Sequence, residues 1–225
     1  MCDLGQPHAH GSSHYGFIVD APEVRALIAE AGRRLRQSIG DDAARVDALR
    51  PAFARLLAAE GWLPAFCAQP DAHSRMGGGI GQDALYRALH GSLCLFALVV
   101  SPGAATPVHD HLAWGLVGVY RGQQEETFYR RLDNGNVKGR AVLEISRRIV
   151  VSTGEFYAIV PPRDDIHYVA TLSDRPSISI HLLANDTACV WRHRFDPAAG
   201  TVAPFRSGYS NAPCPPEDAA PPPRG

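Results

Sequence analysis

From about residue 85 onward, the chain is a succession of short strand-like segments separated by turn signals. The first is an apolar run from Leu93 to Val100, which is typical of a buried strand. Further segments of this kind, bounded by Gly, Pro, Asn or Asp, lie near 112–120, 125–132, 141–151, 155–160, 177–183 and 188–195. Many short strands at regular spacing predict a sandwich or a small barrel, so we expect a mainly β fold.

The first quarter of the chain has a different pattern. Asp20, followed three residues later by Glu23, matches a capping box, and apolar residues at helical spacing follow it. A second helix is expected over about 43–60, where Pro51 either divides it or marks a new start. The sequence therefore predicts a helical segment over about 20–61 ahead of the β region.

Both ends of the 225-residue chain have compositions typical of disorder. Residues 1–18 are rich in Gly, Ser and His, and residues 212–225 are rich in Pro. We therefore expect a disordered arm over 1–18, a single domain over 19–211 with its barrel at about 85–200, and a disordered tail over 212–225.

Charge and composition exclude several classes of protein. The 22 Lys and Arg residues balance 23 Asp and Glu residues to a net charge of −1, which argues against a nucleic-acid-binding protein. No apolar run approaches the length of a membrane span, and no signal peptide precedes the first helix, so we expect a cytoplasmic protein. Five Cys residues without a CxxC pair do not predict a disulfide framework, and the sequence indicates no oligomeric state.

Two local interpretations follow from the same reading. Cys94 and Cys189 lie in apolar runs, where a buried free thiol is the usual state. The polar stretch 123–126 and the pair Arg130 and Arg131 are interpreted as solvated strand edges.

A histidine pair carries the clearest chemical signal. His109 and His111 are two residues apart, so on a strand both imidazoles point to one face, and imidazole is a common ligand of Fe, Zn, Cu and Ni. A third ligand is expected from His167, which follows an apolar run and the turn at Pro161 and Pro162. The sequence therefore predicts a three-histidine metal site.

The spacing of these residues resembles the two motifs of the cupin superfamily, G-x5-HxH…G and G…P…H. The resemblance implies a double-stranded β-helix, or jelly-roll, barrel. The Glu that cupins often carry after HxH falls at Gly115 or Leu116, and neither residue can bind a metal. Three neutral His ligands resemble the thiol dioxygenases of the cysteine dioxygenase type I family. The segments that most resemble its bacterial 3-mercaptopropionate dioxygenase branch are TPVHDHLAWGLVGVYRG, SISIHL and SGYSN.

The resemblance, which extends over about 20–211, implies an Fe²⁺ cofactor and dioxygen as co-substrate. Three neutral ligands leave the full charge on the ion, which favours an anionic thiolate. The implied reaction adds both oxygen atoms to the sulfur of a small carboxylated thiol and yields a sulfinate. We expect 3-mercaptopropionate, L-cysteine or mercaptosuccinate as the thiol.

The family also implies residues around the metal. Arg87 resembles the residue that binds the substrate carboxylate, for which Arg163 and Arg175 are alternatives. Ser179 and His181 resemble a hydrogen-bonded catalytic relay whose third member is usually Tyr. Leu183 occupies that position here, and we expect Tyr209 to supply a hydroxyl at the substrate.

Two other functions fit the same residues. A three-histidine zinc hydrolase would need a general base, and Asp110 should point away from the barrel because it alternates with the two His. A non-catalytic cupin that binds a ligand fits the loss of the relay Tyr.

Overall fold

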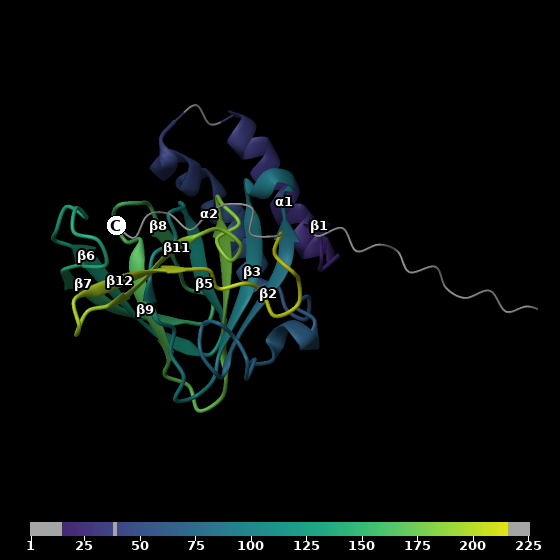
Figure 1. Cartoon of the computed structure of the whole chain (residues 1–225). Coiled ribbons are helices and arrows are strands. Elements are labelled where there is room, and N and C mark those ends of the chain that lie inside the picture. Colours follow the sequence, from purple (N-terminus) through teal and green to yellow (C-terminus); the bar gives the residue numbers. More distant parts are fainter. Residues whose placement is uncertain (1–14, 38–39, 216–225) are drawn as a thin grey trace, which may run out of the picture.

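A computed structural model describes residues 15–37 and 40–215 of the chain, and its main body is two antiparallel six-stranded sheets (Figure 1). The first sheet contains, in spatial order, β1 (Gly16–Phe17), β2 (Ile80–Arg87), β3 (Cys94–Val100), β10 (Ser177–Leu183), β5 (Gly115–Arg121) and β8 (Phe156–Ile159). The second contains β12 (Thr201–Phe205), β11 (Arg192–Asp196), β4 (Val108–His109), β9 (Ile166–Thr171), β6 (Gln123–Arg131) and β7 (Leu143–Ser152).

The strand order makes a jelly-roll barrel. Strands that are consecutive in the chain, such as β3, β4 and β5, alternate between the two sheets, while β10 pairs with both β3 and β5. The barrel interior is filled by side chains from both sheets, including Phe96, Leu98, Val117, Phe128 and Val169. The mainly β jelly roll with N-terminal helices is therefore confirmed.

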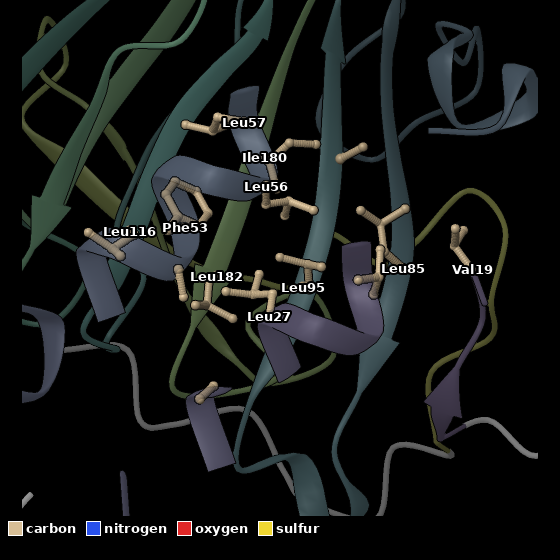
Figure 2. Close-up of a cluster of buried hydrophobic side chains, with 14 of the residues drawn as sticks. Val19, Leu27, Phe53, Leu56, Leu57, Leu85, Leu95, Leu116, Ile180 and Leu182 are labelled. Carbon is tan, nitrogen blue, oxygen red and sulfur yellow. The ribbon is translucent and has the colours of Figure 1, made fainter. Parts of the chain in front are cut away.

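The helices α1 (Pro22–Gln37) and α2 (Asp42–Ala58) cover the outer face of the first sheet (Figures 1 and 2). Phe53, Leu56 and Leu57 of α2 pack with sheet residues that include Leu116 and Ile180 (Figure 2). α2 packs directly over a glycine of β5.

That glycine is Gly118. A Cβ there would lie 2.4 Å from Leu57 Cδ1 and 2.6 Å from Phe156 Cβ, so only glycine lets the helix approach this closely. Pro51 lies inside α2 and does not divide it. The side chain of Asp20 pairs with Arg25, one turn into α1. Among the helices of the described residues, none is both long and apolar enough to cross a bilayer.

The ends of the chain are more ordered than expected where the structure describes them. Gly16 and Phe17, expected in the arm, pair with Arg87 and Tyr86 of β2. Residues 206–215, here called the C-terminal strap, run back along the same strand, where Ser210 N donates to Gln82 O at 2.7 Å. Residues 1–14 and 216–225 of the expected arm and tail lie outside the described residues.

Besides β1, four strands were absent from the expected set. β2 and β12 carry few β-branched residues, β4 is two residues long, and β9 follows directly on a turn. The segment expected as a strand over 188–195 begins as a turn and becomes β11 only at Arg192.

Candidate metal centre

Backbone pairing brings the three predicted ligands together. His109 of β4 and His167 of β9 are register partners, and His111 follows two residues after His109, just beyond the end of the strand. The ring centroids of the three imidazoles lie 4.7–5.0 Å apart, and their potential ligand atoms all lie within 4.8 Å of one another. All three side chains are buried. Among the described residues, this is the one group of three or more His, Cys, Asp or Glu with such geometry.

The Nδ1 atoms of two of the three rings form hydrogen bonds to backbone carbonyl groups. His109 Nδ1 donates to Pro107 O at 2.8 Å, and His111 Nδ1 donates to Asp165 O at 3.1 Å. A carbonyl oxygen can only accept, so both rings carry their proton on Nδ1 and leave the Nε2 lone pair for a metal.

The third ring is held by two side chains. His167 Nδ1 lies 3.2 Å from the Tyr157 hydroxyl and 3.0 Å from Glu126 Oε2. The opposite nitrogen, His167 Nε2, is buried and has no hydrogen-bond partner within the described part of the chain. An orphaned buried nitrogen beside two other imidazoles fits a metal ligand.

The electrostatic environment keeps the ligands neutral. Burial, followed by the charge of Arg192, holds the pKa of His109 well below its usual range. Burial has the largest effect on His111 as well and lowers its pKa, and it lowers the pKa of His167 to about 3. Neutral imidazole is the form that binds metals.

The strand that follows the His pair supplies no carboxylate ligand. A Cβ on Gly115 would lie 2.1 Å from Leu182 O, so no side chain fits at this position. Leu116 is buried in the core under the helices, on the opposite face from the metal ligands. The donor set is therefore three neutral imidazoles, and a divalent ion bound here would retain its charge and open coordination positions.

Ser179 and His181 lie on one face of β10, as predicted. Ser179 Oγ lies 3.0 Å from His181 Nε2, and the imidazole stacks on Phe96 with ring centroids 4.5 Å apart. Burial, and next the nearby His111 and His167, hold the pKa of His181 well below its usual range. His181 therefore lies beside the metal ligands, with its Nδ1 buried and without a hydrogen-bond partner in the described residues.

The two predicted substrate residues meet at Asp186. Arg87 is fully buried, and its Nε and Nη2 donate to Asp186 Oδ2 at 2.9 and 2.6 Å. Its Nη1 donates to Pro213 O of the strap at 3.0 Å. The hydroxyl of Tyr209 donates to the other oxygen of Asp186 at 2.7 Å. Arg87 and Tyr209 thus bind an internal carboxylate, and Phe96 contacts both the Tyr209 and His181 rings.

Sequence analysis missed a cation near the metal ligands. Arg192 is fully buried, and its guanidinium donates to Thr187 O, Asp110 O and Ser207 Oγ at 2.8–2.9 Å. Burial lowers its pKa to about 10, which leaves it charged at neutral pH. No motif marks Arg192, because it is one of many Arg residues in the chain.

Sequence analysis also missed Glu126 and Tyr157. The expectation of a solvated edge at 123–126 is wrong for Gln124 and Glu126, which are fully buried. Alternation places both on the inner face of β6 with Phe128, and this apolar residue is the signal that could have identified the face. Burial raises the pKa of Glu126 well above its usual range, and the hydrogen bond from Tyr157 opposes this effect.

The cysteine interpretation needs one correction. Cys94 is a buried free thiol, as expected, but Cys189 forms a disulfide with Cys214 of the strap. The two residues are 25 positions apart, and Cys214 lies in the segment expected to be disordered. The strap lies against the turn that follows β10. No local sequence pattern predicts this path.

No protein-family model matches the chain. It is similar to an oxalate oxidase in complex with glycolate at 19% identity, over 52% of this chain and 56% of that one, with a TM-score of 0.38. It is also similar to a Cupin_2 domain of an XRE family transcriptional regulator from Enterobacter cloacae at 16% identity, over 46% of this chain and 94% of that one, with a TM-score of 0.33. The two antiparallel six-stranded sheets give the chain a jelly-roll fold.

A third similarity, to the oxalate decarboxylase of Lactobacillus farciminis, covers 43% of this chain and 25% of that one at 16% identity and a TM-score of 0.31. The matching part of the chain thus spans about half of the oxalate oxidase and a quarter of the oxalate decarboxylase. These similarities concern the fold alone.

Proposed function

We propose that this cupin is an iron-dependent thiol dioxygenase acting on a small carboxylated thiol. The observation that carries the proposal is the donor set, three buried neutral imidazoles without a carboxylate ligand. Such a set favours Fe²⁺ with an anionic thiolate, because no ligand charge offsets that of the ion. A metal bound here would supply the common site for thiolate and dioxygen.

The reaction balances without a further reductant. A thiol and one dioxygen give a sulfinic acid, so the sulfur loses four electrons and dioxygen gains four. Both oxygen atoms become bonded to sulfur, and the thiol proton leaves on binding.

Two features of the chain suit this reaction. One is a side-chain pair that can accept the thiol proton, and the other is a buried positive charge that favours an anionic substrate. Ser179 and His181 form a hydrogen-bonded pair beside the ligands, with His181 Nδ1 free to accept. The buried Arg192 contributes a positive charge that favours an anionic substrate at the same place. Arg87 remains the residue that we predict to bind the substrate carboxylate. A substrate carboxylate at Arg87 would compete with that of Asp186.

The zinc hydrolase is less well supported, because Asp110 and Asp165, the carboxylates next to the predicted ligands in the sequence, are occupied. Asp110 bonds the backbone N–H and Nδ1 of His193, each at 2.7 Å, on the outer side of the sheet. Asp165 accepts from the backbone N–H groups of His111 and Leu112 at 2.9 and 3.1 Å. Neither is placed as a free general base.

The decisive experiment is oxygen uptake by iron-loaded protein with separate thiols, followed by analysis for the sulfinate. The panel contains 3-mercaptopropionate, L-cysteine, mercaptosuccinate and, as the thiol without a carboxylate, cysteamine. Uptake coupled to sulfinate with one carboxylated thiol supports the proposal and identifies the substrate. Iron-loaded protein that consumes no oxygen with any thiol would favour the ligand-binding cupin, consistent with Leu183 in the relay position.

A further inference from the structure

The barrel interior contains a carboxylate that the proposed reaction does not use. Glu126 of β6 is fully buried, and its Oε2 lies 3.0 Å from His167 Nδ1. β6 pairs with β9 in a register that sets Phe128 opposite His167. Glu126 thus reaches along the inner face of its strand to the ring of a metal ligand.

The tyrosine beside this pair belongs to the same arrangement. The Tyr157 hydroxyl lies close to Glu126 and 3.2 Å from His167 Nδ1. Tyr157 comes from β8 of the first sheet, and its ring packs edge-on against Phe128. The ligand ring is therefore held from both sheets.

A carboxylate in this position is not explained by stability of the fold. It lies on the inner barrel face, where its neighbours Phe128 and Val169 are apolar. In the described residues, no Lys or Arg forms an ion pair with it, and burying a carboxyl group without a hydrogen-bond partner is costly whether it is charged or neutral. An apolar residue would cost less free energy to bury at this position. The contact of Glu126 with the predicted ligand His167 is therefore the physical reason for a carboxyl group here.

We propose that Glu126 is a positioning residue of the metal centre. Its carboxyl group lies 3.0 Å from His167 Nδ1 and, together with the Tyr157 hydroxyl at 3.2 Å, fixes the ring with Nε2 toward the metal. The other two ligands donate to backbone carbonyls, which are uncharged. His167 is thus held by two side chains, whereas His109 and His111 are held by the backbone.

This inference rests on the metal site of the proposed function but not on the thiol reaction. The test therefore measures binding of Co²⁺, an oxygen-stable probe, by competition with a chromophoric chelator. We expect Glu126→Gln to keep the volume of the side chain and to weaken Co²⁺ binding about 10- to 100-fold. The visible absorption of the bound Co²⁺ should shift, and the melting temperature of the metal-free variant should equal or exceed that of the wild type.

The matched control is Gln124, which is fully buried on the same face of the same strand and bonds Ser177 Oγ at 3.0 Å. Gln124→Leu removes that bond far from the ligands, so it should lower the melting temperature and leave Co²⁺ affinity and absorption unchanged. Glu126→Asp keeps the carboxyl group but moves it away from His167, and an intermediate affinity is expected. It serves as the test variant if the Gln variant does not fold.

The results of these experiments distinguish a positioning role of Glu126 from a role in the stability of the fold. Wild-type Co²⁺ affinity and absorption in folded Glu126→Gln or Glu126→Asp would overturn the positioning role. Loss of thermal stability with unchanged affinity would assign Glu126 to the fold instead. If the wild type binds Co²⁺ through the three His but oxidises no thiol, the proposed reaction fails while the role of Glu126 stands.

Discussion

His109 and His167 are direct register partners on the adjacent strands β4 and β9, although 58 positions separate them in the chain. One backbone pairing thus fixes the spacing of two predicted metal ligands, and His111 completes the set from the residues that follow. A site built on paired strands is rigid, because moving one ligand requires breaking the ladder.

Metal content should depend on each of the three ligands. We expect His109→Ala, His111→Ala or His167→Ala to lower the affinity for Fe²⁺ or Co²⁺ by more than about 100-fold, since each removes a direct ligand. His73→Ala is the matched control, because His73 is exposed. Stoichiometric metal in any of the three ligand variants, measured by elemental analysis, would contradict the site.

Stability should vary with pH through His181. Its folded pKa lies well below the unfolded value of about 6.5, so below that pH the unfolded chain takes up a proton that the folded protein refuses. The resulting stability is therefore complete above about pH 6.5 and is lost as the pH falls toward the folded value. His181→Gln removes this effect.

The measurement is the free energy of unfolding of metal-free protein between pH 7 and pH 5. The wild type should lose up to about 1.4 kcal/mol per pH unit more than the variant does. Parallel pH profiles would show that His181 titrates normally in the folded protein.

The buried pair of Arg87 and Asp186 should dominate stability at the strap. Arg87→Met leaves the carboxylate of Asp186 buried without its cation, so we expect a loss of about 3–5 kcal/mol in the free energy of unfolding. Adding Asp186→Asn should restore part of the loss, measured by denaturant titration. A folded Arg87→Met protein of wild-type stability that no longer binds a carboxylated thiol would instead support the predicted substrate role.

The disulfide between Cys189 and Cys214 should stabilise the oxidised protein. It closes a loop of 25 residues, for which chain-entropy reasoning gives about 3 kcal/mol. Dithiothreitol should lower the melting temperature of the wild type but not that of Cys214→Ser. An equal response of both proteins would assign the effect to another group.

Periodicity and motif spacing were sufficient for the barrel, the helices and the convergence of the three histidines. They failed where the fold brings distant residues together. Alternation around Phe128 could have shown that Glu126 faces inward, but its pairing with His167 depends on the register of β6 with β9. The partner of Arg87 could not be predicted, because Asp186 lies in a turn after β10 whose path no local pattern specifies.

The two ends of the described chain lie along one strand. Gly16 and Phe17 pair with the end of β2, and Ser210 and Asn211 bond its earlier residues through Gln82 and Ala84. Together they act as a split outer strand that covers the open edge of the first sheet. The backbone groups of an uncovered strand edge can pair with strands of other chains. We therefore expect truncation of either end to expose the edge of β2 and to promote aggregation before it affects the metal ligands.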